Sequence, residues 1–341
     1  MKKKIWITAI FALLLIVGII SGLVYKKYFS PFFEISRTVY VYINENKDYN
    51  DLLSQLESVA HIKDVNAFDR LAKAAKYQER MRTGRYAITP DITCKQLLQK
   101  LKNGNQAPCR VTFNNIRLKE DLAKRIGQQL MFDEGTLYSQ LNDSSACTAL
   151  GFDINTILCL FIPDTYEMYW NIPAEKFLNK MKSEYNKFWT PERLEKAQEI
   201  PLTPVQVSAL ASIVEEETAA SSEFPIIAGL YINRLKRNML LQADPTVKYA
   251  IGDFSLKRVL NIHLEYDSPY NTYKYAGLPP GPIRIPSIRG IDAVLNHEKH
   301  DYIFMCAKED FSGKHNFATT LMEHNKNAAK YQAALNRNKI K

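Results

Sequence analysis

The chain has 341 residues, of which 46% are hydrophobic and 24% are charged, so it has the composition of an ordinary globular protein with room for two modest domains. Its net charge of +9 is spread along the sequence. That charge suits an anionic polymer or a lipid surface, but the absence of a dense basic cluster argues against a nucleic-acid-binding protein.

The N-terminus predicts a membrane anchor. Three lysines, Lys2 to Lys4, precede an apolar run over residues 5–24, and an aromatic and basic stretch follows over 25–28. Twenty residues at ~1.5 Å each span the ~30 Å core of a bilayer. A cleaved signal peptide is the alternative, but its apolar region is usually ~7–15 residues and ends at a small-residue site that this sequence lacks. We expect residues 1–28 to form a cytoplasmic tip and an uncleaved transmembrane helix, with the N-terminus inside and the remainder outside the bacterial cytoplasmic membrane.

Residues 29–37 are predicted to be a linker, and residues 38–114 a small α+β module. Strands are expected where β-branched and aromatic residues gather, and helices between them. The predicted strands cover 38–43, 84–88 and 109–113, and the predicted helices cover 49–59, 67–77 and 92–101, the last capped near Thr89 or Asp91.

From residue 115 to 341 the sequence predicts a mainly helical α+β domain. The expected elements are a helix at 118–130, helix or loop at 143–150, an aromatic loop at 161–166, a charged amphipathic helix at 174–199, a helix from 203 to 218, a helix at 222–238, a Pro- and Gly-rich region at 244–290, a strand at 302–306 and a helix at 320–335. The predicted fold class is therefore α+β: a transmembrane helix, a small module and a larger, mostly helical domain.

The helix that starts at Thr203 carries the most informative residues. Thr203, Pro204 and Gln206 form a capping-box start with proline at the first helical position. One apolar stripe follows at helical spacing: Val207, Leu210, Ala211, Val214 and Thr218.

Three carboxylates, Glu215, Glu216 and Glu217, end this helix. Glu217 lies one turn beyond Ile213 and Val214, so we expect burial and the negative helix end to raise its pKa most. Glu215 is expected on a small polar flank, and Glu216 on the far side. A neutral carboxylic acid in a cleft can protonate a leaving group, although a solvated helix end is the ordinary alternative.

Other catalytic and metal motifs are absent from the sequence. There is no nucleophile elbow, phosphate loop, dinucleotide fingerprint or HExxH, and His297 with His300 is expected at the surface. The five cysteines show no metal spacing. Cys94 with Cys109 or Cys147 with Cys159 could pair in an oxidising compartment; the alternative is that the thiols are small buried hydrophobes.

Two further segments suit a sugar-binding cleft. Asp244 lies in a loop before Pro245 and is either a second carboxylate or a turn residue. Residues 268–286 combine prolines, glycines and three tyrosines, whose faces suit sugar rings; the alternative is a rigid structural loop.

Taken in order, these motifs resemble the YceG-like family of endolytic murein transglycosylases. The resemblance covers residues 1–335 and rests on the following segments: Ala-Ser-Ile-Val-Glu-Glu-Glu-Thr at 211–218, Leu-Gln-Ala-Asp-Pro-Thr-Val at 241–247, Tyr-Asn-Thr-Tyr at 270–273, Gly-Leu-Pro-Pro-Gly-Pro-Ile at 277–283, His-Asn-Phe-Ala-Thr at 315–319, and His324 with Asn325.

The resemblance implies a membrane-anchored enzyme that cuts nascent glycan strands internally at the β-1,4 bond between N-acetylmuramic acid and N-acetylglucosamine, leaving 1,6-anhydro ends without water, cofactor or metal. It implies that the small module is LysM-like and that peptidoglycan, the cytoplasmic membrane and cell-wall synthases are partners. Glu217 matches the essential family Glu, and Glu216 departs from the pattern because relatives often have a basic residue there. Supporting or sugar-binding roles are expected for Glu215, Gln242, Asp244, Thr246, Tyr270, Asn271, Thr272, Tyr273, Pro279, Pro280 and Asn325.

Two rival functions stay open at this point. A muramidase would hydrolyse the same bond and would need Asp244 as a second carboxylate. A membrane-anchored wall-binding protein would need no catalytic acid.

Overall fold

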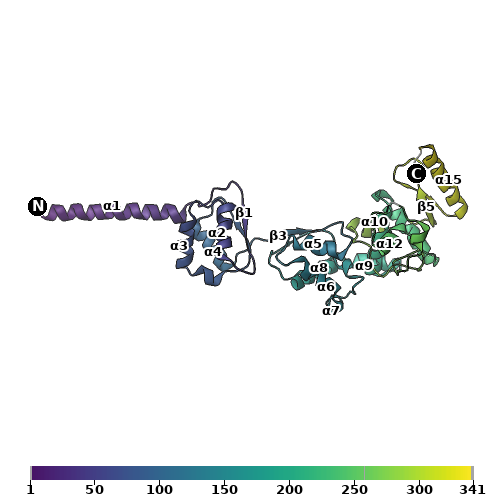
Figure 1. The fold of residues 1–341 in the computed structure, drawn as a ribbon, viewed down its shortest axis with the longest axis horizontal. Coiled ribbons are helices and arrows are strands. Elements are labelled where there is room, and N and C mark those ends of the chain that lie inside the picture. Colours follow the sequence, from purple (N-terminus) through teal and green to yellow (C-terminus); the bar gives the residue numbers. More distant parts are fainter. Residues whose placement is uncertain (1, 257, 339–341) are drawn as a thin grey trace. The chain divides into compact units, whose positions relative to one another are not determined.

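The computed structural model describes residues 2–256 and 258–338 (Figure 1). The chain divides into two compact units. The N-terminal unit contains the chain up to Val111 together with Gln129–Phe132 and Tyr166–Ile172. The C-terminal unit contains Thr112–Gln128, Asp133–Thr165 and the chain from Pro173 onward.

The described part of the chain is mostly helical with three small sheets, which confirms the mixed α+β class. β1 (Val39–Ile43) pairs antiparallel with β2 (Gly84–Ile88), with Val41 opposite Tyr86. β3 (Cys109–Thr112) pairs with β4 (Thr165–Met168), and β5 (Phe304–Ala307) pairs antiparallel with β6 (His315–Ala318). β4 and β6 were not expected: residues 161–166 were assigned to an aromatic loop, and no element was assigned to 315–318.

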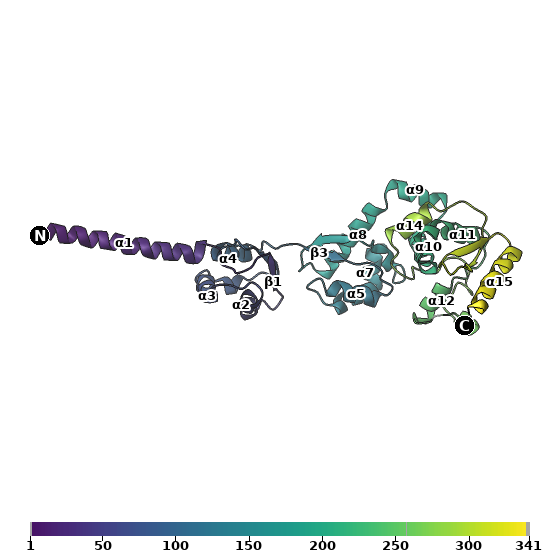
Figure 2. The same cartoon turned by 90° about the horizontal axis from the view of Figure 1, so that it is seen from above.

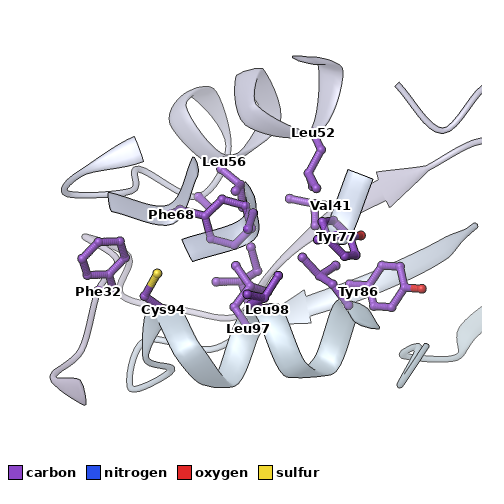
Figure 3. Close-up of a cluster of buried hydrophobic side chains, with 14 of the residues drawn as sticks. Phe32, Val41, Leu52, Leu56, Phe68, Tyr77, Tyr86, Cys94, Leu97 and Leu98 are labelled. Atoms are coloured by element: carbon purple, nitrogen blue, oxygen red, sulfur yellow. The ribbon is translucent and has the colours of Figure 1, made fainter. Parts of the chain in front are cut away.

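The N-terminal unit follows the predicted order of strands and helices. Its helices are α1 (Lys2–Phe29), α2 (Tyr49–Ser58), α3 (Val65–Ala74), the short 3-10 helix η1 (Tyr77–Arg80) and α4 (Cys94–Asn103). The predicted cap of α4 is wrong by a few residues, since Thr93 forms the capping box with Gln96. Figure 3 shows the core, in which Val41, Leu56 and Phe68 converge between the helices and the sheet. The LysM-like character of this unit stays a prediction.

The linker predicted at 29–37 is wrong for its central residues. Phe32 and Phe33 are each only 4% exposed and belong to the core of the N-terminal unit (Figure 3 labels Phe32). The backbone is tied there as well: the amide of Phe32 donates to Ile92 O at 3.2 Å and its carbonyl accepts from Lys63 N at 3.1 Å. Two adjacent aromatic rings are too apolar to remain in a solvated linker.

α1 covers the residues predicted to form the anchor. Large apolar side chains on α1 are exposed, among them Phe11, Leu14 and Leu23. Over the residues that the structure describes, no helix combines the length and the apolarity needed to cross a membrane.

The C-terminal unit contains the remaining helices. They are α5 (Lys119–Gly127), α6 (Glu134–Asn142), α7 (Ser144–Ala149), η2 (Ile157–Leu160), α8 (Ala174–Phe188), α9 (Pro191–Glu199), α10 (Pro204–Glu217), η3 (Ser221–Glu223), α11 (Phe224–Lys236), α12 (Asp244–Ile251), α13 (Asn261–Leu264), α14 (Ile288–Leu295) and α15 (Leu321–Arg337). The helix predicted at 174–199 is two helices, because Thr190 caps α9 and Pro191 cannot continue α8. α15 packs on the β5–β6 hairpin.

α10 is buried on all sides rather than along one stripe. All residues from Val207 to Val214 are buried, and Figure 2 shows α11 and α14 beside the helix. The two buried serines are satisfied locally: Ser208 donates to Pro204 O at 3.0 Å, and Ser212 donates to Ala209 O at 2.7 Å. The side chain of Ser212 also accepts from the amide of Ile283 at 3.0 Å. The predicted capping box at Thr203 is confirmed.

Substitution of Phe32 tests its place in the core. We expect Phe32→Ala to lower the free energy of unfolding of the N-terminal unit by about 3–5 kcal/mol, as for other buried phenylalanines. Hydrogen exchange at the amides of β2 would measure this change, with exposed Ser36→Ala as the control. Equal protection in both variants would contradict the burial of Phe32.

Candidate active site

The three carboxylates at the end of α10 have different partners. Glu215 accepts from the amide of Ser287 at 3.0 Å and from its hydroxyl, and its Oε2 lies 3.6 Å from Nε of Arg284. Its side chain is only 6% exposed, so Glu215 is buried among polar partners. Glu216 forms ion pairs with Arg117 at 2.6 Å and with Arg284 at 2.9 Å. Both acids are thus neutralised by arginine.

Glu217 is partly buried, and the described residues form no ion pair with it. Its Oε1 accepts the hydroxyl proton of Tyr231 at 2.6 Å. Burial raises the pKa of Glu217 to about 7, and the charge of Asp244 adds to the rise. The Tyr231 hydrogen bond, Arg234 and Lys248 oppose the rise in pKa but do not cancel it. The predicted direction of the shift and its leading cause are confirmed.

Glu217 opens into a cavity of about 220 Å³ within the C-terminal unit. The walls come from α10, α11, the loop before α12, Tyr273 and the β5–β6 hairpin. The lining residues are Glu217, Leu230, Tyr231, Arg234, Leu241, Gln242, Asp244, Tyr273, Met305, Cys306, Ala307 and His315. Polar side chains from several elements therefore converge on one partly protonated carboxyl group, as a binding or catalytic site requires.

Asp244 and Tyr273 form a second polar pair that lines this cavity. The hydroxyl of Tyr273 donates to Oδ1 of Asp244 at 2.6 Å. Asp244 is exposed and is the first residue of α12. The backbone of Gln242 has φ 51°, in the left-handed region. Its backbone N–H donates to Thr272 O at 3.1 Å, which fixes the turn into α12. The structure thus brings predicted residues Glu217, Gln242, Asp244 and Tyr273 together.

Three predicted site residues form the wall behind the cavity. Thr246, Asn271 and Thr272 are at most 1% exposed. The hydroxyls of the two threonines lie 2.8 Å apart, and the amide group of Asn271 donates to the carbonyls of Leu264 and Tyr266 at 2.8 Å each. Because these polar atoms are used within the fold, these side chains support the cavity rather than face a ligand.

The other predicted residues do not line the cavity. Tyr270 packs on Tyr249 with ring centroids 4.8 Å apart. Pro279 is buried, whereas Pro280 and Asn325 are exposed. Within the segment considered at 268–286, Tyr273 lines the cavity, whereas Ile283 and Arg284 bond residues of α10 and so have a structural role.

Several lining residues were missed from the sequence. Tyr231 and Arg234 lie one turn apart on α11, a spacing that places both on one face. The guanidinium of Arg234 donates to Ile303 O at 2.7 Å and to Leu241 O at 2.8 Å, so it joins the hairpin to the loop before α12. Cys306 lines the same cavity, and burial raises the pKa of its thiol.

His315 is held in the cavity wall by a buried carboxylate. Nδ1 of His315 lies 2.9 Å from Oε2 of Glu223, and its backbone amide donates to Oε1 at 2.9 Å. The hydroxyl of Thr218, next to Glu217, donates to Oε2 of Glu223 at 3.3 Å. The side chain of Glu223 therefore connects the β5–β6 hairpin to the end of α10 through hydrogen bonds.

The cysteines form no disulfide in the structure. All five cysteines are free, and Cys94, Cys147 and Cys159 are buried, as the small-hydrophobe interpretation predicted. Among the described residues, no group of histidine, cysteine and acidic side chains is placed to hold a metal ion.

Comparison with known proteins identifies the family. The profile of the YceG-like family matches residues 41–330. The chain belongs to the YceG-like family. YceG-like relatives include a Bacillus subtilis protein named endolytic murein transglycosylase, which is 29% identical over 315 residues, covering 88% of this chain and 86% of the relative. A Streptococcus pneumoniae protein of the same name is 26% identical, and its match spans 86% of this chain and 58% of the relative.

A solved YceG-like structure shares the fold. The crystal structure of a YceG-like protein from Listeria monocytogenes superposes with a TM-score of 0.55 at 27% identity. The match covers 85% of this chain and 99% of the Listeria chain.

The raised pKa of Glu217 has a consequence for stability. A carboxyl group whose pKa is about 7 when folded and 4.5 ordinarily stabilises the fold fully below pH 4.5 and loses this contribution as the pH rises through 7. Since glutamine never ionises, we expect Glu217→Gln to be more stable than the wild type at pH 8 by about 1–3 kcal/mol, and equal to it near pH 4.5.

Thermal or urea unfolding across this pH range would measure the difference. Glu309→Gln is the control, because hydrogen bonds from its own backbone and from Asn316 lower the pKa of Glu309. A Glu217→Gln variant that gains no stability at pH 8 would contradict the raised pKa.

Proposed function

We propose that this protein is an endolytic lytic transglycosylase of peptidoglycan. The observation that carries the proposal is Glu217: a carboxyl group with a pKa raised to about 7, which lines a cavity in a chain of the YceG-like family. The relatives named endolytic murein transglycosylase support the substrate and the type of reaction. The bond cleaved is the β-1,4 bond between N-acetylmuramic acid and N-acetylglucosamine.

In the proposed reaction, Glu217 acts first as an acid and then as a base. The protonated carboxyl group donates to the glycosidic oxygen while the bonding pair leaves with that oxygen. The 6-hydroxyl of the muramic sugar attacks its own anomeric carbon, and the Glu217 carboxylate takes the hydroxyl proton. The product is a 1,6-anhydro end, no water is consumed, and Glu217 is protonated again.

The remaining polar groups of the cavity would serve the sugars. Asp244, held by Tyr273, supplies a negative charge that stabilises an oxocarbenium-like transition state. Gln242 and His315 present hydrogen-bonding groups to the same space. Internal cleavage of nascent strands would end their elongation, with cell-wall synthases as the enzymes that supply the strands.

A hydrolytic muramidase is the second candidate, because Asp244 places another carboxylate in the cavity. Mass spectrometry of digested glycan strands separates the two reactions. We expect 1,6-anhydro ends from the wild-type enzyme, and at least a hundredfold slower release from Glu217→Gln because the acid is lost. Reducing ends that carry an added water would favour the muramidase, and undiminished cleavage by Glu217→Gln would exclude Glu217 as the acid.

We also propose that the N-terminus anchors the enzyme in the bacterial cytoplasmic membrane, with the C-terminal unit on the outer side. The support is the apolar run at 5–24 between basic residues, and the exposure of apolar side chains such as Phe11 (70%) and Leu14 (64%) on α1. We expect the full chain to sediment with membranes and resist extraction by salt. A chain that begins at residue 30 should be released, and retention of that shorter chain would contradict the anchor.

A further inference from the structure

The hydrogen bond between Tyr231 and Glu217 fixes one of the two carboxyl oxygens. Tyr231 is 1% exposed, and its hydroxyl donates to Oε1 of Glu217 at 2.6 Å. Burial, together with the neighbouring Glu217 carboxyl, raises the pKa of Tyr231 well above its usual value, so the hydroxyl keeps its proton at every working pH. Tyr231 is therefore a permanent donor to Oε1.

A carboxylic acid carries its proton on one oxygen at a time. An oxygen that already accepts a short hydrogen bond from a hydroxyl is the poorer site for that proton, because the two hydrogens would oppose each other. No other hydrogen bond to Glu217 comes from the described residues. Oε2 is thus the oxygen left for the proton and for the substrate.

We propose that Tyr231 is a positioning residue that occupies Oε1 of Glu217 and thereby keeps the catalytic proton on Oε2. The proposal rests on the transglycosylase reaction proposed above. The Oε2 proton passes to the glycosidic oxygen as the bond from that oxygen to the anomeric carbon breaks. Oε2 then accepts the proton of the 6-hydroxyl as its oxygen bonds to the anomeric carbon, so the same atom is acid and base.

Tyr231 also stabilises the Glu217 carboxylate that exists between the two proton transfers. When Glu217 has given up its proton, the Tyr231 hydrogen bond becomes charge-assisted and therefore stronger. The bond thus favours the carboxylate, opposite to the effect of burial. Removal of the hydroxyl should raise the pKa of Glu217 further and leave its proton free to reside on either oxygen.

The cavity offers a matched control. Tyr273 lines the same space, and its hydroxyl donates at the same distance of 2.6 Å, but to Asp244 instead of Glu217. Loss of either hydroxyl removes one oxygen atom and one hydrogen bond to a carboxylate. Only the loss of the Tyr231 hydroxyl removes a hydrogen bond from Glu217, so only that loss should shift the pKa of Glu217 in this way.

The first experiment compares the pH dependence of kcat/KM in Tyr231→Phe and Tyr273→Phe. We expect the alkaline limb of Tyr231→Phe to move to higher pH by about one unit, and its kcat at the optimum to fall about tenfold or more. The alkaline limb of Tyr273→Phe should stay at the wild-type pH. Identical alkaline limbs in both variants and the wild type would overturn the proposal.

A second variant covers the case in which Tyr231→Phe fails to fold. A ring-fluorinated tyrosine at position 231 keeps the shape but is a stronger donor, so the Glu217 titration should move to lower pH. The carboxyl band of Glu217 in infrared difference spectra, assigned by its absence in Glu217→Gln, reports this titration without any turnover. An unchanged band titration in the fluorinated protein would overturn the proposal.

The two experiments also separate this proposal from the proposed function. Wild-type protein that releases no 1,6-anhydro ends would contradict the transglycosylase, while the infrared titration would still decide the role of Tyr231. If the wild-type enzyme releases 1,6-anhydro ends but the titration of the Glu217 band is the same with tyrosine and with fluorinated tyrosine at position 231, only the positioning role is contradicted.

Discussion

A carboxylate at the end of a buried helix must find a cation or bind a proton, because the anion is too costly to leave unpaired away from water. α10 ends in three such groups within one turn. Arg284 forms ion pairs with two of them, with Glu216 at 2.9 Å and with Glu215 at 3.6 Å, and Arg117 forms a second ion pair with Glu216. From the part of the chain that the structure describes, Glu217 receives a single hydrogen bond, from a tyrosine hydroxyl, and burial raises its pKa to about 7. Glu215 and Glu216 are paired with arginine, and burial without such an ion pair from any described residue separates Glu217 from them.

The rest of the C-terminal unit holds this arrangement in place. Ile283, next to Arg284, donates its amide to Ser212 inside α10, so the proline-rich segment is fixed to the same helix whose charges it neutralises. On the other side, Arg234 connects the β5–β6 hairpin to the loop before α12, and Glu223 connects that hairpin to the end of α10. Two buried polar groups, Arg234 and Glu223, thus connect the hairpin to the loop before α12 and to the end of α10.

Local sequence signals predicted much of this structure. The capping box at Thr203, the apolar character of α10 and the strands of the N-terminal unit depend on neighbours within a few residues, and each is close to its predicted position. Some elements and breaks were harder to predict: β6 pairs with β5 in a contact that its own residues do not indicate, and a proline in a charged helical pattern divided α8 from α9. Phe32 and Phe33 were assigned to a linker because their partners, such as Ile62 and Ile92, lie far away in the sequence.

In the candidate site, too, features set by nearby residues were predicted and features set by distant residues were not. Glu217 was chosen from the sequence because its position on α10 and the family motif agree, but the pairing of its neighbours was not foreseen. The side chain of Glu215 is only 6% exposed, and its partner Arg284 is 69 positions away, within a segment expected to bind sugars. Tyr231 and His315 reach the cavity from α11 and β6, and no periodicity in either segment distinguishes a side chain that faces an acid from one that faces the core. A pattern along the chain indicates which groups are buried, whereas the charge state of a buried acid is decided by residues that only the folded chain brings to it.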